Sequence, residues 1–151
     1  MTRIFIDANI LVSVLNREYP IFRMSARVMS LSDNPAFSLY TSATCLAIAF
    51  YFASKKCKES VAFEKMKFLC ERLEIANAGK EEVLATLKNK KIRDFEDGIQ
   101  HYAALNSGCN YIITEDRDDF YFSEIPVMNC ETFLRDVVLP RLGEKPGKRD
   151  Q

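Results

Sequence analysis

Aspartate side chains at three places in the sequence are the residues best suited to chemistry. Asp7 ends the apolar run 4–6, Asp97 begins an apolar-periodic segment, and Asp116 follows the apolar run 111–113. Gathered carboxylates repel one another, and a bound Mg²⁺ or Mn²⁺ ion is the usual physical reason for gathering them. Such ions stabilise the attacking and leaving oxygens when a phosphodiester bond is cleaved. The sequence therefore favours metal-assisted phosphodiester chemistry.

Histidine and cysteine contribute little to this picture. His101 is the only histidine, and the five cysteines are widely spaced with no C-x-x-C pair. An all-oxygen ligand set selects hard cations such as Mg²⁺ and Mn²⁺. An odd number of scattered cysteines predicts free thiols and a reducing, cytoplasmic location.

Two of these acids also have a purely structural interpretation. Asp7 is a favoured N-cap for the helix expected after it. Asp94 and Asp97 resemble a capping box at the start of another helix. However, Asp97 falls in register with the apolar stripe near positions 101 and 104, which turns it inward. An inward carboxylate is costly unless it is paired or bound to metal, so both interpretations remain open.

The turn after the run 111–114 is strongly acidic. Positions 115–119 hold four acids in five residues, and aromatic residues follow at 120–122. We expect Glu115 and Asp118 to be solvated, while the aromatic residues pin the turn against the core.

The elements that must position these acids alternate along the chain. Since apolar strands alternate with helical periods, the pattern predicts a parallel α/β sheet covered on both faces. Ligands of such sheets bind outside the carboxyl ends of the strands, where Asp7 and Asp116 would meet. We expect the helix at 43–53, which is apolar at nearly every position, to be largely buried. Strands are expected at 3–7, 37–40, 73–76, 111–114 and 125–128, and helices at 10–15, 22–31, 43–53, 61–72, 80–87, 95–107 and 130–139.

The length and net charge of the chain limit the classes of protein to which it can belong. The 151 residues are 48% hydrophobic, and 21 basic residues balance 21 acidic ones. This composition fits a single domain at 1–142 followed by a flexible basic tail at 143–151. No apolar run approaches the ~18 residues of a membrane span. The zero net charge argues against a protein that coats nucleic acid by bulk charge.

Basic residues nevertheless cluster beside the acids. One cluster, which we call the cationic rim, directly precedes Asp94; three further lysines, at 55, 56 and 58, close the helix at 43–53. These clusters are either solvated helix ends or groups that position RNA phosphates. The cationic rim consists of Lys88, Lys90, Lys91 and Arg93.

From Arg3 to about Leu134 the sequence resembles the PIN domain family, which includes the VapC-like toxins. The resemblance rests on the segments 5–11 (FIDANIL), 94–100 (DFEDGIQ) and 113–120 (ITEDRDDF) in this order. It implies a three-layer α/β/α sandwich with a parallel central sheet and an acidic Mg²⁺ or Mn²⁺ site. Matched position by position, the family's metal-binding acids fall on Asp7, Asp97 and Asp116. The resemblance adds Asp119 as a fourth catalytic acid, with Thr114 and Asn9 as supporting polar residues.

Ile48 departs from the family pattern. The family usually places a glutamate at this point of its helix, although a subgroup carries a non-acidic residue there. The change removes one charge and one potential ligand, which should weaken metal affinity. Glu96 substitutes for it only if its side chain turns inward.

Two main functional hypotheses follow from the resemblance. The first is a metal-dependent endoribonuclease, the toxin of a type II toxin–antitoxin pair, with RNA as substrate and with an antitoxin protein and a second copy of the chain as partners. The second is a PIN-fold module with weakened catalysis that binds RNA or protein. A phosphatase-like use of Asp7 is disfavoured, because such enzymes need a second acid where Asn9 stands.

Overall fold

The computed structural model describes residues 1–143, so the predicted tail beyond Gly143 lies outside the described residues. Its centre is a sheet in which all neighbouring strands are parallel and the order is β3-β2-β1-β4-β5. Within residues 1–143 no helix is long and apolar enough to cross a membrane. The strands are β1 (Thr2–Ile6), β2 (Phe37–Ser42), β3 (Glu74–Ala76), β4 (Tyr111–Ile113) and β5 (Val127–Met128).

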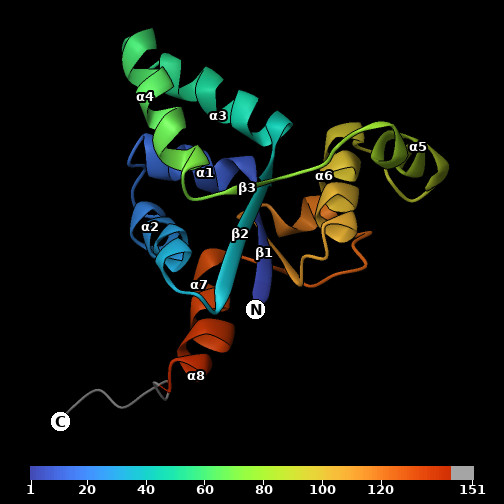
Figure 1. Cartoon of the computed structure of the whole chain (residues 1–151). Helices are drawn as coiled ribbons and strands as arrows, with labels where there is room; N and C mark the ends of the chain where they lie inside the picture. The colour runs from blue at the N-terminus through green and yellow to red at the C-terminus, as the bar shows by residue number, and fades with distance from the viewer. Residues whose placement is uncertain (144–151) are drawn as a thin grey trace.

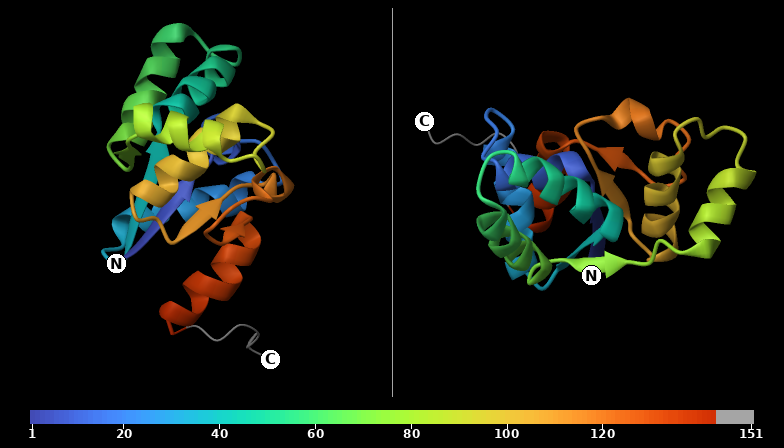
Figure 2. Two further views of the ribbon diagram at one scale, coloured as in Figure 1. Left: turned by 90° about the vertical axis from the view of Figure 1, so that its right-hand side faces the viewer. Right: turned by 90° about the horizontal axis from the view of Figure 1, so that it is seen from above.

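Helices cover both faces of the sheet (Figures 1 and 2). α5 and α6 pack together on one face, whereas α2 contacts both α1 and α7 on the other. This three-layer α/β/α sandwich with a parallel central sheet is the predicted fold class, and it is confirmed. The helices are α1 (Ala8–Leu15), α2 (Phe22–Ser30), α3 (Ala43–Ser54), α4 (Glu59–Cys70), α5 (Lys80–Lys88), α6 (Phe95–Asn106), α7 (Cys130–Phe133) and α8 (Leu139–Arg141), the last two joined by a π-helical turn at Leu134–Val138.

The two central strands bring the first and last acidic segments together. All side chains at 4–6 and 112–113 are fully buried, as expected for parallel strands covered on both faces. Ile6 pairs with Ile113, and the N–H of Asp7 continues the ladder by donating to the carbonyl of Ile113 over 3.0 Å. Asp7 therefore emerges beside the end of β4, at the carboxyl edge of the sheet.

α3 differs from its prediction. Only its small residues, Cys45, Ala49 and Ala53, are buried, while Tyr51 is 54% and Phe52 45% exposed. α3 packs against α1 and α4, and the α3–α4 pair stands beyond the carboxyl ends of the strands (Figure 1). Its inner face carries small side chains, whereas the larger Leu46, Ile48 and Phe50 are only half-buried at the edge of the core. The prediction of a largely buried helix was wrong.

Candidate active site

A hollow of about 390 Å³ lies at the carboxyl edge of β1 and β4. We call it the acidic hollow. The five acids that the sequence analysis connected with a metal site all line it, together with Asn9, which the same analysis gave a supporting role. Its lining residues are Asp7, Ala8, Asn9, Val12, Glu18, Ile48, Phe52, Glu96, Asp97, Asp116 and Asp119.

Asp7 is both an N-cap and an acid of the hollow, the two roles that the sequence left open. Its Oδ1 accepts the N–H of Ala8 at 2.8 Å, which caps α1. Its Oδ2 accepts the hydroxyl of Thr114, also at 2.8 Å. Burial raises the pKa of Asp7, and the charge of Asp116 adds to the rise, although hydrogen bonds from Thr114 and Ala8 oppose it. The capping carboxylate thus also faces the acidic hollow.

Thr114 and Asn9 connect Asp7 to Asp116. Thr114 is fully buried, and its Oγ1 accepts the side-chain N–H of Asn9 at 3.0 Å and the backbone N–H of Asp116 at 3.1 Å. Asn9 Nδ2 also donates to Oδ2 of Asp116 at 3.2 Å. Polar groups that bond to carboxylates in this way fix their orientation.

Asp97 reaches the acidic hollow from the first turn of α6. Asp94 is the N-cap of this helix, and its Oδ1 accepts the N–H of Asp97 at 3.0 Å. Asp97 itself is half-buried, and its pKa rises to about 7, first through burial and then through the charge of Asp94, followed by other acids of the hollow. The capping interaction therefore leaves the carboxylate of Asp97 turned inward.

Glu96 also turns toward the acidic hollow, which it lines beside Asp97. Its pKa is raised by burial first and then by the charges of Asp94 and Asp7. Glu96 thus lines the hollow while it stays exposed to solvent.

The donor set fits a hard divalent cation. Carboxylates and the amide of Asn9 line the acidic hollow without any histidine or cysteine, and oxygen donors are those that Mg²⁺ and Mn²⁺ prefer. Burial raises the pKa of both Asp7 and Asp97, and neighbouring acids add to the rise. Within residues 1–143, no three Asp, Glu, His or Cys side chains already stand in a metal-holding arrangement. The carboxylates would thus have to close around an ion.

Ile48 and Glu18 occupy the part of the acidic hollow nearest the helices. Ile48 projects from α3 and is half-buried. Glu18 follows Arg17, which adopts a positive φ of 49°, and its N–H donates to the carbonyl of Ser13 at 3.0 Å. The sequence analysis missed Glu18, since no periodicity indicates where a loop side chain points.

The cationic rim does not line the acidic hollow. Lys90, Lys91 and Arg93 line a separate hollow of about 550 Å³ together with residues 121–124. Lys88 ends α5 and lines neither of the two. The rim adjoins the site only through the chain, because Arg93 directly precedes Asp94.

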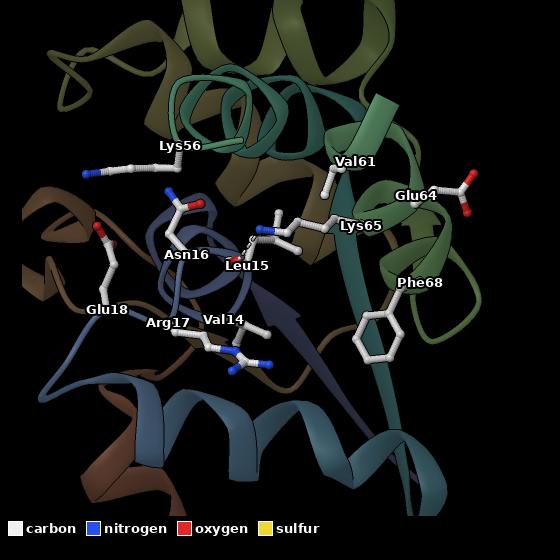
Figure 3. A pocket seen from close by; sticks show the side chains of 10 residues that line it. All are labelled: Val14, Leu15, Asn16, Arg17, Glu18, Lys56, Val61, Glu64, Lys65 and Phe68. Atoms are coloured by element: carbon white, nitrogen blue, oxygen red, sulfur yellow. Dashed lines mark hydrogen bonds between the residues drawn. The ribbon is translucent and has the colours of Figure 1, made fainter. Parts of the chain in front are cut away.

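A second cationic region borders the acidic hollow more closely. A hollow of about 670 Å³ between α1 and the α3–α4 pair contains Arg17, Lys56 and Lys65, and Glu18 lines both this hollow and the acidic one. Figure 3 shows Lys56 and Glu18 on the same side of it, with Lys65 bonded to the carbonyl of Leu15 at 2.9 Å. Of the lysines at 55, 56 and 58, Lys56 is the one placed beside the site.

His101 packs in the core and does not line the acidic hollow. It is fully buried, and its ring packs edge-on against Phe122 at 5.3 Å between centroids. Its Nε2 accepts the backbone N–H of Glu124 at 3.0 Å. Glu115, expected to be solvated, instead accepts the N–H of Cys130 at 3.3 Å. Glu115 thus links the acidic turn to the start of α7, and His101 holds the segment 122–124 against the core.

Comparison with known proteins yields matches over most of the chain. Residues 3–118 match the model of the PIN domain family. Over 135 residues the chain is 28% identical to Ribonuclease VapC1 of Aquifex aeolicus (strain VF5), covering 87% of this chain and 92% of that protein. A similar fold occurs in VapBC2 from Rickettsia felis bound to a promoter DNA fragment (TM-score 0.64, 17% identity, 85% of this chain and 98% of that chain). It also occurs in VapBC-1 from nontypeable Haemophilus influenzae (TM-score 0.65, 19% identity, 86% and 99%).

Proposed function

The chain belongs to the PIN domain family, and from this membership we propose that it is a Mg²⁺- or Mn²⁺-dependent endoribonuclease of the reducing cytoplasm. The observation that carries the proposal is the gathering of Asp7, Asp97 and Asp116 around one hollow. Carboxylates with raised pKa values and no cationic partner in that hollow suit a site that holds a divalent cation.

In this proposal Asp7, Asp97 and Asp116 hold the ion, with Asp119 and Glu96 beside them. The ion supplies Lewis-acid stabilisation and an activated water for attack on an RNA phosphate. The hydroxyl of Thr114 holds the carboxylate of Asp7, and Asn9 holds that of Asp116. The cationic rim then serves the phosphates of more distant nucleotides.

The partners follow from the similar proteins. Ribonuclease VapC1 and the VapBC structures support a toxin role for this chain, in which a cognate antitoxin protein binds it. A second copy of the chain remains a proposed partner.

A second candidate function is a PIN-fold module with weakened catalysis that binds RNA or protein. The observation in its favour is Ile48, whose apolar side chain lines the acidic hollow. One ligand fewer lowers the affinity for the ion. An active ribonuclease and a catalytically weakened module therefore differ mainly in the metal concentration that cleavage requires.

Cleavage of single-stranded RNA by the purified protein tests the proposal. We expect cleavage with Mn²⁺, none with EDTA, and a loss of at least about 100-fold in Asp97→Asn. Asp118→Asn is the matched control, because Asp118 is an exposed acid of the neighbouring turn that does not line the hollow. Equal cleavage by Asp97→Asn and wild type would refute the catalytic assignment.

A further inference from the structure

Phe52 gives the acidic hollow an aromatic wall. Its side chain lines the hollow beside Ile48, one turn earlier in α3, and Val12 of α1. Although Phe52 is large and apolar, it is 45% exposed. The hollow therefore combines two linings of different chemistry: carboxylates from the strand ends and α6, and apolar side chains from α1 and α3.

A nucleotide has the same two-part character. Its phosphate is drawn to a divalent cation, and its flat base stacks on aromatic rings when it is unpaired. The hollow of about 390 Å³ falls within the size range of small-ligand sites, which begins at about 300 Å³. Building on the proposed ribonuclease function, we propose that Phe52 stacks on the base beside the scissile phosphate of unpaired RNA.

Phe52 lies where the end of α3 meets the end of α1. The ring of Tyr51 packs edge-on against it, with centroids 5.3 Å apart and an interplanar angle of 81°. Asn16 Nδ2 donates to the carbonyl of Phe52 at 3.4 Å, which ties the end of α3 to the end of α1.

A lysine lies next to the apolar wall, where the RNA strand would leave the acidic hollow. Ile48 and Phe52 lie four residues apart on one side of α3, and Lys56 follows in the turn just beyond the end of this helix. Lys56 lines the neighbouring hollow, which shares Glu18 with the acidic one (Figure 3). A strand whose base lies on Phe52 would therefore bring its next phosphate toward a lysine.

Ile48 gains a role in this arrangement. A glutamate there would interrupt the apolar wall with a charge, whereas isoleucine continues it from Val12 to Phe52. The substitution that removes a potential ligand thus extends the surface against which a base packs. The apolar wall favours a base that has left its stack, and it selects single-stranded over duplex substrate.

Two variants on neighbouring residues test the role of Phe52. Phe52→Ala removes the ring, whereas Tyr51→Ala removes an equally exposed ring that does not line the hollow. Phe52→Tyr restores an aromatic face. Once the cleavage site is mapped, a single-stranded RNA carrying 2-aminopurine beside it reports stacking by fluorescence, recorded by rapid mixing in Mn²⁺ before cleavage proceeds.

We expect wild type, Tyr51→Ala and Phe52→Tyr to change the 2-aminopurine fluorescence on binding, and Phe52→Ala to lose this change. In Mn²⁺, Phe52→Ala should raise KM about 5- to 150-fold, the range that stacking of one base provides, with kcat changed less. Phe52→Leu gives the same losses if the alanine variant fails to fold.

If the wild type cleaves RNA and Phe52→Ala shows the same fluorescence change and the same KM as the wild type, the inference is overturned. The exposed ring would then be a contact for a protein partner. If the wild type fails to cleave RNA at all, the proposed function fails instead. In that case a titration in Mn²⁺ with single-stranded RNAs that carry 2-aminopurine at different positions still decides whether Phe52 stacks on RNA.

Discussion

The hydroxyl group of Thr114 donates a hydrogen bond to Oδ2 of Asp7 over 2.8 Å and joins residues 107 positions apart in the sequence. Oγ1 of Thr114 also accepts hydrogen bonds from the side chain of Asn9 and from the backbone N–H of Asp116. A hydroxyl has one donor and two acceptor sites, so all three are used. The first and last acids of the site are thereby held in place by one side chain.

Replacing Thr114 with valine should loosen this arrangement. The valine has the same shape but leaves the buried Oδ2 of Asp7 without its donor, which costs about 1–3 kcal/mol of stability. Supporting contacts of this kind are worth about 10- to 100-fold in metal affinity. Calorimetric titration with Mn²⁺ measures the loss, and Thr114→Ser should restore most of the affinity. Wild-type affinity in Thr114→Val would contradict the role of the hydroxyl.

Metal binding should depend on pH through Asp97. Because its pKa is raised to about 7, an ion must displace a proton from this carboxyl group below that pH. One displaced proton predicts that Mn²⁺ affinity rises about tenfold between pH 6 and pH 8. Calorimetry in buffers of different ionisation enthalpy counts the protons released. Asp118→Asn should show the same pH dependence. A wild-type Mn²⁺ affinity that does not change with pH would contradict the displacement of a proton from Asp97.

His101 should make the fold sensitive to acid. Burial lowers its pKa, although the charge of Glu124 opposes this, and protonation of Nε2 would break the bond from Glu124. The unfolded chain takes up a proton near pH 6.5, whereas the folded chain resists it. The free energy of unfolding is therefore complete above pH 6.5 and falls as the pH drops toward the lowered pKa. Urea unfolding at pH 7.5 and 5.5 should show a smaller decrease in His101→Gln, and an equal decrease would refute this.

Gly98 should tolerate no side chain. A Cβ there would lie 2.3 Å from Cγ2 of Thr86, where α6 meets α5. Alanine favours a helix over glycine by about 1 kcal/mol, but overpacking of this kind costs about 1–3 kcal/mol, and at 2.3 Å we expect the clash to prevail. Thermal unfolding should show Gly98→Ala to be destabilised, and Gly98→Ala with Thr86→Ser to recover. Gly79→Ala is the control, since its nearest contact is 3.5 Å; equal effects at Gly79 and Gly98 would contradict the clash.

Introducing a glutamate at position 48 should strengthen the metal site. Ile48→Glu adds a carboxylate to the acidic hollow, and we expect Mn²⁺ affinity and cleavage at low Mn²⁺ concentration to rise. Ile48→Gln has the same length without the charge, so it separates ligation from loss of the apolar wall. Equal affinities in the two variants would show that position 48 does not reach the ion.

The acids of the site were predictable because local patterns position each of them. Asp7 follows a buried strand, and parallel pairing with β4 brings it beside Thr114. Asp97 follows the helical period of α6, which turns it inward. Because ligands bind at the carboxyl ends of parallel strands, these segments were expected to meet at one edge of the sheet.

The remaining lining residues were not predictable from these patterns. α3 is apolar around most of its circumference, so no periodicity indicates that Ala49 faces inward and Phe52 faces the hollow. Glu18 depends on the left-handed backbone of Arg17, which the sequence does not signal. The cationic rim is close to Asp94 in sequence, but the turn between α5 and α6 directs Lys90 and Lys91 to another hollow.

The location of a bound Mn²⁺ ion tests the central claim most directly. Crystals of the protein soaked in Mn²⁺ reveal the ion by its anomalous scattering. We predict a peak in the acidic hollow within ligand distance of Asp7, Asp97 and Asp116. A hollow without a peak at millimolar Mn²⁺, or an ion held only by other residues, would contradict the account.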